Sequence, residues 1–460
     1  MYLICAFFAV FSSFLLFRRA VGCMSIQRLN MMSWIFYMDF ILYSVIGAIL
    51  VVYKIDHHYV IDKLMFESSR TFGFFAILYA IVFFPVGMLF ANFVFNIKDI
   101  KNKFLTYLRK PIEKERKYND CNVRFFLILL SIICVLSVMY VLYTLGTIPI
   151  VRLLIDKGTF DTSLFRGGIS SEFSGMGLYI KNIFALGLTP LLSYMAYGYK
   201  KLSNTRQNKI WFYIMFLASI CIVTHNYEKS PLIIYFLGFL FYKVYTCGKL
   251  PKKFILFCIL FVLSLLIGMY WILNVEMGID IIELFSYNRG IVGRIILSQC
   301  GGTFMTLDLF PSVIDHLGFS SVSSLWASLF NLEYSETSAR LIMGELFPGA
   351  VMEGTAGVMN SLFIAEAWAN FGWYGLIISP IYVGFIIQSL FLFFLKSPKT
   401  PFFLAFFVYY SARSSLTGGF NAYIYNPQVL LFLGLIILIY GMVRLMDYRR
   451  YVGLMYENGK

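Results

Sequence analysis

The segment TFGFFAILYAIVFFPVGMLFANFVFN, residues 71–96, contains no Lys, Arg, Asp or Glu. The run KDIKNKFLTYLRKPIEKERK, residues 98–117, follows it directly and is strongly basic. A helix needs about 20 apolar residues to cross a bilayer, so residues 71–96 are long enough to span. Because Lys and Arg gather in cytoplasmic loops, the basic run predicts the inner end of this span. Nucleic-acid binding is the alternative interpretation of such a run, but we favour anchoring beside anionic lipid headgroups.

The rest of the chain has a similar composition. Of its 460 residues, 60% are hydrophobic and 13% are charged, and the mean hydropathy is +0.76. Soluble proteins carry about 25% charged residues, so this chain could not cover a water-exposed surface. In lipid the backbone must pair with itself, which leaves helices or a closed barrel. Apolar and polar residues do not alternate within the runs, as they would in the strands of a barrel, and this favours helices. We therefore predict an all-α polytopic integral membrane protein, with residues 1–460 as one membrane domain.

The apolar runs predict about eleven transmembrane helices. Arg18 and Arg19 follow the first run, whereas a cleaved signal peptide carries its positive charges before the apolar region. The first run is therefore expected to be a retained span. The predicted spans are 1–17, 33–53, 71–96, 125–145, 177–198, 210–224, 231–246, 254–274, 372–395, 402–413 and 427–443.

Charge orients these spans. An N-terminus outside and a C-terminus in the cytoplasm put most of the 38 Lys and Arg inside, and most of the 24 Asp and Glu elsewhere. Residues 97–124 then form a basic cytoplasmic loop, and residues 146–176 form an outer loop. Residues 275–371 form a large outer loop whose amphipathic stretches are expected to lie at the interface or over a cavity.

Lys and Arg residues on the predicted outer side are few, so the presence of each one there requires an explanation. One reason is structural, because each could pair with a loop carboxylate such as Glu172, Glu228 or Glu336. As a set they favour function, since guanidinium groups bind phosphate oxygens in a bidentate way and suit a diphosphate. The set is Arg166 in RGGISSEFSG, Lys229 in HNYEKSP, Arg289 and Arg294 in YNRGIVGR, Arg340 in ETSARLIMGE, and Arg413 in YYSARSSLTGG.

The stretch FIAEAWANFGWYG, residues 363–375, holds the sharpest candidate site. Glu366 and Asn370 are four residues apart, so on a helix they share one face. An ionisable residue at the outer membrane edge is a functional candidate by default, and a carboxylate there could act as a general base. The alternative is an interhelical hydrogen bond or a salt bridge to a nearby Arg. Phosphate-loop, HExxH, GxSxG and CxxC motifs are absent, so no nucleotide or metal chemistry is predicted.

Several fragments of the chain resemble the bacterial O-antigen polymerase (Wzy) family and the enterobacterial common antigen polymerases. These are SSEFSG before a span, the short loop with Lys229, the YNRG start of the large loop, and AEAWANFGWYG before a late span. The resemblance implies a membrane glycosyltransferase fold of C type in the bacterial inner membrane. It implies polymerisation of undecaprenyl-diphosphate-linked repeat units on the outer side, without metal or cofactor, into O-antigen or a related surface polysaccharide of lipopolysaccharide biosynthesis.

By this resemblance, Arg166, Arg289 and Glu366 match the family's catalytic positions. Glu366 would take the proton of the acceptor or position it, and the cations would stabilise the departing diphosphate. The remaining candidates, expected to bind substrate, are Arg294, Arg340, Lys229, Arg413, Asn370 and Tyr287. The implied partners are the lipid-linked glycan as both donor and acceptor, membrane lipid, and a chain-length regulator or copolymerase, with no nucleic acid.

Three other functions fit parts of the pattern. An O-antigen ligase shares the large outer loop and leans on an outer histidine, for which His316 is the candidate. A lipid-linked glycan flippase or other transporter usually has short loops and cations inside its spans. The long 275–371 loop and the apparent absence of charge in mid-span regions argue against a transporter. A structural or sensory membrane protein would leave the outer Arg residues without a role.

The predicted orientation can be tested with fusion reporters. We expect alkaline phosphatase, which is active only outside the cytoplasm, to be inactive when fused after Lys117 and active when fused after Glu353. Green fluorescent protein at the same two points should give the reverse pattern, at matched expression measured by immunoblot. Active phosphatase at Lys117 would overturn the orientation.

Overall fold

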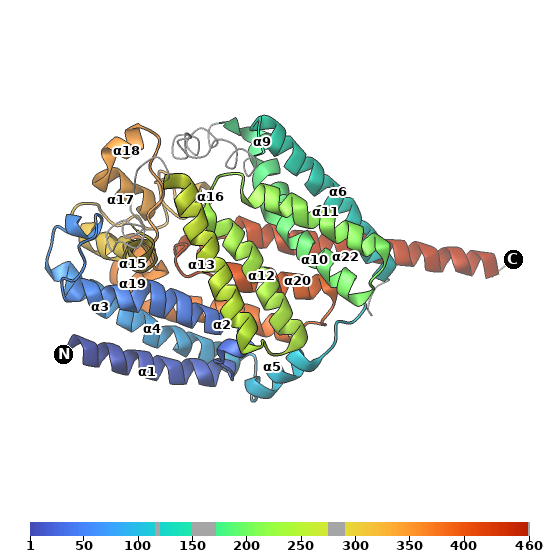
Figure 1. The fold of residues 1–460 in the computed structure, drawn as a ribbon, viewed down its shortest axis with the longest axis horizontal. Coiled ribbons are helices and arrows are strands. Elements are labelled where there is room, and N and C mark those ends of the chain that lie inside the picture. The colour runs from blue at the N-terminus through green and yellow to red at the C-terminus, as the bar shows by residue number, and fades with distance from the viewer. Residues whose placement is uncertain (116–119, 149–171, 275–289, 459–460) are drawn as a thin grey trace. The chain divides into compact units, whose positions relative to one another are not determined.

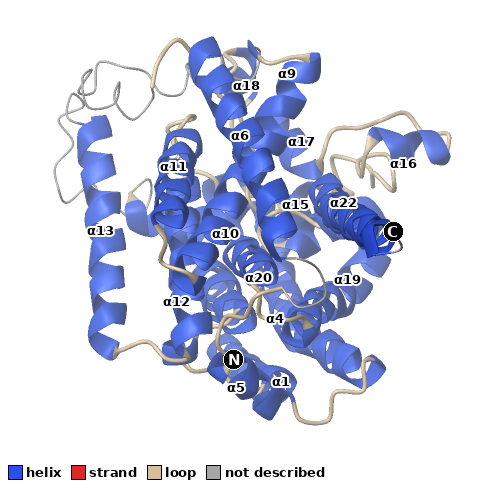
Figure 2. Ribbon diagram, turned by 90° about the vertical axis from the view of Figure 1, so that its right-hand side faces the viewer, coloured by secondary structure: helices blue, strands red, loops and turns tan. Residues whose placement is uncertain are grey.

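A computed structural model describes residues 1–115, 120–148, 172–274 and 290–458. Within these ranges the chain is helical and has no β-strand (Figure 2), apart from one isolated bridge between Ser361 and Gly418. The chain divides into two compact units. Unit 1 holds residues 1–108, 248–396 and 413–425, and unit 2 holds residues 109–247, 397–412 and 426–460.

Unit 1 contains both ends of the large predicted outer loop and the first three predicted spans (Figure 1). In the described residues its helices are α1 (Tyr2–Val21), η1 (Ile26–Arg28), α2 (Met31–Trp34), η2 (Ile35–Val45), α3 (Ile46–Val52), η3 (Ile61–Lys63), α4 (Ser68–Val94), α5 (Ile100–Arg109), α13 (Lys252–Asn274), α15 (Ile291–Leu309), α16 (Ser324–Leu329), α17 (Ser338–Leu346), α18 (Pro348–Met352), α19 (Phe363–Lys396) and α21 (Asn421–Ile424).

Unit 2 contains the middle of the chain and its last helix. In the described residues its helices are α6 (Asp120–Thr144), α9 (Gly175–Tyr179), η4 (Ile180–Leu188), α10 (Thr189–Leu202), α11 (Arg206–Val223), α12 (Lys229–Cys247), α20 (Pro401–Arg413) and α22 (Pro427–Asn458). The segments η2 and η4 are π-helical and continue into α-helix at both ends, so each lies inside one long helix.

Every one of the predicted spans falls on a helix. Among the described residues, eight helical stretches are long and apolar enough to cross a membrane, which makes the chain a multi-pass helical membrane protein. They are Tyr2–Arg28, Met31–Val52, Ser68–Val94, Asp120–Thr144, Gly175–Leu202, Ser230–Cys247, Phe363–Lys396 and Asn421–Asp447. The other predicted spans coincide with α11, α13 and α20; their crossing of the membrane, the total of eleven and the orientation stay predictions, as does the single membrane domain.

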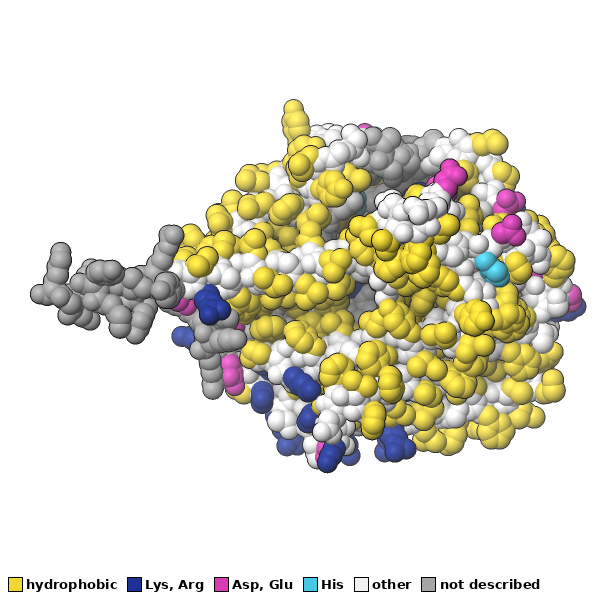
Figure 3. All heavy atoms as spheres, turned by 180° about the vertical axis from the view of Figure 1, so that it is seen from behind, with side chains coloured by type: hydrophobic (Ala, Val, Ile, Leu, Met, Phe, Trp, Pro, Cys, Tyr) yellow, Lys and Arg dark blue, Asp and Glu magenta, His cyan; other side chains and the backbone are white. Residues whose placement is uncertain are grey.

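Hydrophobic side chains cover much of the molecular surface. The face in Figure 3 is dominated by them. Phe7 and Phe8 of α1 are 65% and 63% exposed, and Leu136 of α6 is 59% exposed. In water such a surface would drive aggregation, whereas in a bilayer it faces lipid at no cost.

The two long helices α4 and α19 form the centre of unit 1, and glycines let them approach closely. A Cβ atom on Gly87 of α4 would overlap the carbonyl oxygen of Ile381. In return, a Cβ atom on Gly384 of α19 would overlap the carbonyl oxygen of Phe84. Small residues at the crossing are the usual means of packing helices in lipid, where backbones can then make close contact.

A buried amide pair adds polar contacts to the same packing. The Gln388 side chain donates hydrogen bonds to Asn92 Oδ1 at 2.8 Å and to the Ala20 carbonyl at 3.0 Å. Asn92 donates to the same Ala20 carbonyl at 2.8 Å. These bonds connect α19, α4 and the last turn of α1, which ends at Gly22 in the left-handed conformation. Both amide nitrogens and the Asn92 oxygen thus have partners, which lowers the cost of burying them in lipid.

Helix α15 differs from the expectation for the large outer loop. Leu297, Cys300 and Phe304 are at most 1% exposed, and the helix packs against η2, α3, α4 and α19 instead of lying at the interface. Gly47 and Gly73 make room, since a Cβ there would strike Cys300 and Phe304 respectively. The sequence did not predict this core helix, because Arg294, Gln299 and Asp308 lower the mean hydropathy of its residues.

The core of unit 2 is aromatic. Tyr194 of α10 donates to the Tyr235 carbonyl of α12 at 2.7 Å, and its ring occupies the space left by Gly238. Ser193 and Tyr235 share a hydroxyl–hydroxyl bond of 2.6 Å. The Trp211 indole of α11 donates to Ser131 of α6 at 3.0 Å. The hydroxyls of Tyr194 and Tyr235 are thus paired inside the unit, as burial favours.

The glycine contact between α4 and α19 gives a prediction with a matched control. Gly87→Ala should destabilise the protein, because the methyl group overlaps backbone that cannot move cheaply; overpacking of this kind costs about 1–3 kcal/mol. Gly344→Ala in α17 should be neutral or stabilising by up to about 1 kcal/mol, since nothing lies within 4 Å of its added Cβ. Thermal unfolding in detergent measures both, and equal midpoints would contradict the packing account.

Candidate functional site

The segment 413–425 departs from regular helix inside unit 1. Helix α20 ends at Arg413, residues 414–420 are irregular, and the four-residue helix α21 follows. Backbone polar groups at membrane depth must find partners within the protein. In this segment two buried carboxylates provide them, Asp39 from η2 and Glu366 from α19.

Asp39 is 2% exposed and accepts from the Leu416 N–H at 3.2 Å and from the Ser415 hydroxyl at 3.3 Å. It lies eight residues after Met31, within the candidate span Met31–Val52, and therefore roughly 12 Å along it at 1.5 Å per residue. Segment 413–425 therefore contacts this span well inside it, and not at either of its ends. π-Helical segments such as η2 frequently occur at functional sites.

Glu366 lies in the first turn of α19 and is 5% exposed. Its Oε2 accepts from the Asn421 N–H at 2.8 Å, at the start of α21. Gly419, with φ +90°, crosses directly over the carboxylate, and a Cβ there would lie 2.5 Å from Oε2. The carboxylate therefore binds the chain's own backbone and is enclosed by it.

Asn370 shares the face of Glu366, which confirms their predicted proximity on one helix. The Ser321 hydroxyl donates to Asn370 Oδ1 at 2.8 Å, and Asn370 donates to Asn421 Oδ1 at 2.7 Å. Asn421 donates in turn to the Ser321 carbonyl at 2.9 Å. We call Ser321, Glu366, Asn370 and Asn421 the polar cluster. It joins the predicted outer loop 275–371, α19 and segment 413–425.

Backbone contacts extend this junction. The Phe363 N–H donates to the Leu416 carbonyl at 2.8 Å, and the Ser361–Gly418 bridge lies beside it. The Leu362 N–H donates to the Thr303 hydroxyl of α15 at 2.9 Å. The start of α19, the core helix α15 and segment 413–425 therefore form one hydrogen-bonded structure.

A break in α19 follows the cluster. Gly372 has φ 55° and ψ −136°, which interrupts the helix between the Glu366 turn and the long apolar part. The Gly318 N–H donates to the Asn370 carbonyl at 2.8 Å, and the Leu317 N–H donates to the Ala369 carbonyl at 3.0 Å. The loop residues thus cap the carbonyls that the break releases. His316 lies at the same place, with Nδ1 3.3 Å from the Ala369 carbonyl oxygen.

The loop 53–67 is fixed to helix α15. Asp308 of α15 accepts from the Met65 and Phe66 N–H groups at 2.8 and 3.0 Å. His58 Nε2 lies 3.0 Å from the Ser298 hydroxyl, and burial lowers the pKa of His58 to about 4, against an opposing effect of Asp62. His58 is therefore neutral at pH 7, and it serves as a hydrogen-bonding group.

The predicted outer cations have different surroundings. Arg294, Arg340 and Arg413 are exposed. Arg340 forms an ion pair with Glu336 at 3.5 Å, one of the structural partners considered from the sequence. Arg166, Tyr287 and Arg289 lie outside the described residues, and Lys229 opens α12 with its side chain also outside the description. Convergence of these cations on one ligand stays a prediction.

Sequence reasoning missed two buried charges within candidate spans. Asp39 is one, and Lys181 of η4 is the other, 7% exposed with its ammonium 4.4 Å from the centre of the Phe173 ring. The statement that mid-span regions lack charge was therefore wrong. The rule that singled out Glu366, which treats an ionisable residue in a span as a candidate, would have found both. Another missed contact is the ion pair of Arg70 with Asp56 at the start of α4.

The described residues contain no group of three His, Cys, Asp or Glu side chains arranged to hold a metal ion. The arrangement at the polar cluster can bind backbone and hydroxyl donors, and it can fix the conformation of segment 413–425. Comparisons with protein-family models, with curated proteins and with solved structures find no match for this chain. The class that fold and composition define is a multi-pass helical membrane protein.

The contact of Asp39 with segment 413–425 can be tested by substitution. Asp39→Ala leaves the Leu416 N–H without an acceptor, which should cost about 1–3 kcal/mol for a buried donor. Asp39→Asn keeps a carbonyl acceptor and should lose less. Thermal unfolding in detergent measures the order. Asp315→Ala, at an exposed position of unit 1, is the control, and an Asp39→Ala midpoint equal to the control would contradict the account.

Proposed function

We propose that this protein polymerises undecaprenyl-diphosphate-linked oligosaccharide repeat units at the outer face of the bacterial inner membrane. The product would be O-antigen or a related surface polysaccharide. The observation that carries the proposal is that one short segment joins a buried carboxylate to an exposed guanidinium. Segment 413–425 is held by Glu366 and Asp39, and it begins at the exposed Arg413. Glu366 belongs to the AEAWANFG stretch on which the family resemblance rests most strongly.

The proposed reaction needs no nucleotide, because the donor is already activated by its diphosphate. A hydroxyl oxygen of the acceptor sugar attacks the anomeric carbon of the donor glycan. The bond from that carbon to the diphosphate oxygen breaks, and undecaprenyl diphosphate leaves with the electron pair. The hydroxyl proton passes to an oxygen of the departing diphosphate. Fixed cations would stabilise the leaving charge, and the proposal assigns this work to Arg166, Arg289 and Arg413, assisted by Arg294 and Arg340.

The surroundings of Glu366 favour a positioning role over that of a general base. Its Oε2 already accepts a backbone N–H at 2.8 Å, and Gly419 crosses over it. A general base must reach the proton that it removes. Glu366 could do so only if segment 413–425 moved away. We therefore infer that Glu366 fixes the segment, so that Arg413 is presented toward the diphosphate.

A transporter of lipid-linked glycan is the second candidate, and a specific observation favours it. Asp39 is buried within a span beside irregular backbone, and broken helices with ionisable residues at membrane depth characterise many transporter sites. An O-antigen ligase is the alternative within glycan transfer, with His316 exposed beside the break in α19.

A reconstitution experiment separates these functions. The purified protein in liposomes receives a chemically defined polyprenyl-diphosphate repeat unit, and lipid-linked products are resolved by gel electrophoresis. A ladder of oligomers is the expected result. Transfer to a lipid A core acceptor alone would indicate a ligase. Movement of the unit across the bilayer without a ladder, for every cognate unit tried, would sink the polymerase proposal.

The role of Glu366 is tested in the same assay. Gln can accept the Asn421 N–H, so Glu366→Gln should keep most of the polymerising activity, whereas Glu366→Ala should lose about tenfold or more at equal protein level. A general base would be lost in both variants, and the positioning assignment would then fail. Glu353→Gln, at an exposed position in the same large loop, controls for removal of charge.

A further inference from the structure

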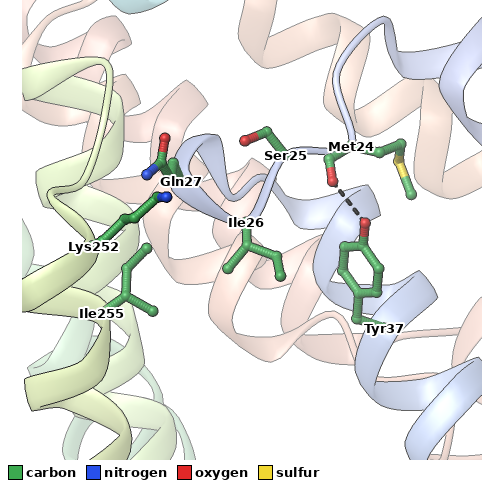
Figure 4. A pocket seen from close by; sticks show the side chains of 7 residues that line it. All are labelled: Met24, Ser25, Ile26, Gln27, Tyr37, Lys252 and Ile255. Carbon is green, nitrogen blue, oxygen red and sulfur yellow. Dashed lines mark hydrogen bonds between the residues drawn. The ribbon is translucent and has the colours of Figure 1, made fainter.

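A second site lies in unit 1, at the end where α1 finishes and α2 begins. It is a cavity of about 430 Å³, lined by Met24, Ser25, Ile26, Gln27, Tyr37, Lys252 and Ile255 (Figure 4). The volume falls in the range of small-molecule sites, about 300–1,000 Å³. The lining comes from the turn between α1 and α2, from η2, and from the start of α13.

Hydrogen bonds build this cavity from segments far apart in the chain. The Leu250 N–H donates to the Gln27 carbonyl at 2.8 Å, which joins the turn before α13 to the turn after α1. The Tyr37 hydroxyl donates to the Met24 carbonyl at 2.7 Å. Asn30 caps α2 by accepting from the Ser33 N–H at 3.0 Å. These bonds hold the turn after α1 against η2 and against the turn before α13.

Two of the segments that line the cavity carry charge of one sign only. Residues 18–28 and 248–255 contain six Lys and Arg and no Asp or Glu. Lys252 lines the cavity itself, and Figure 4 shows its ammonium close to the Gln27 side-chain amide. Two donors on segments that carry no Asp or Glu suit an anion. The six cations are Arg18, Arg19, Arg28, Lys249, Lys252 and Lys253.

The lining is also amphiphilic. Met24, Ile26 and Ile255 supply apolar surface, and Ser25, Gln27 and Lys252 supply polar groups. The cavity lies at the ends of the candidate spans Tyr2–Arg28 and Met31–Val52, where headgroups meet hydrocarbon. A small soluble anion would make no favourable contact with the apolar part of the lining, whereas a lipid presents a phosphate and an acyl chain together.

We propose that this cavity binds the phosphate of an anionic phospholipid headgroup, with Lys252 and Gln27 as its donors and Ile26 and Ile255 against the top of the acyl chains. Basic pockets between membrane helices are known to hold such headgroups. The charge distribution of the chain puts this end on the cytoplasmic side, where anionic lipid is attractive to Lys and Arg. The site shares no residue with the polar cluster and does not depend on the proposed reaction.

The test is lipid binding to the full-length protein. Native mass spectrometry of the detergent-solubilised protein, titrated with phosphatidylglycerol, should show a bound lipid with higher affinity than phosphatidylcholine. Lys252→Ala should weaken phosphatidylglycerol binding by about fivefold, as expected for one Lys near a membrane anion. Ser25→Phe, which fills the cavity without changing charge, should weaken it too.

Controls decide the outcome. Lys103→Ala removes an exposed cation from α5 of the same unit and should leave binding unchanged. Equal affinities of the Lys252→Ala and Lys103→Ala proteins would overturn the proposal, because general surface charge would then explain the binding. Excess inorganic phosphate is added as a competitor. Displacement of the lipid by phosphate would also overturn it, since the cavity would then be a site for the free anion.

Discussion

The structure depends on one constraint, that backbone N–H and C=O groups in hydrocarbon must be paired inside the protein. Regular helices meet it without help, and most of the described chain is helical. Segment 413–425 does not. Helix α20 is 13 residues long, roughly 20 Å, which falls short of the roughly 30 Å hydrocarbon core. Asp39 and Glu366 supply acceptors to the irregular backbone that follows, and buried carboxylates are tolerated there because they are hydrogen-bonded.

Close packing makes this arrangement rigid. Glycines at the crossing of α4 and α19 bring the two backbones together, and Gly47 and Gly73 admit α15 among the spans. Helix α15 then offers Thr303 to the start of α19. Since lipid tails are as apolar as leucine, this close fit, and not hydrophobic burial, holds the helices together. The polar cluster therefore lies on a framework whose position is set by several independent contacts.

The same geometry changes the interpretation of the candidate carboxylate. The sequence indicates Glu366 as a candidate functional residue because it lies at the end of a span, where an ionisable group is costly. Its bond to the Asn421 N–H and the path of Gly419 over it explain why that cost is tolerated. In the proposed function, the carboxylate that organises this loop acts by positioning Arg413. A positioning role and a general-base role can therefore be distinguished, because an amide side chain can replace a carboxylate as a hydrogen-bond acceptor but not as a base.

The sequence by itself determined the class of protein, the positions of the long apolar helices that coincide with the predicted spans, and the shared face of Glu366 and Asn370, because hydropathy and helical spacing are local properties. Only the tertiary structure decided that α15 is a core helix, that Asp39 and Glu366 bind one segment, and that Ser321 and Asn421 complete the polar cluster. These partners are separated by 49 to 377 residues along the chain. No local pattern records such pairings, since they depend on which helices pack together and on where glycines let them approach.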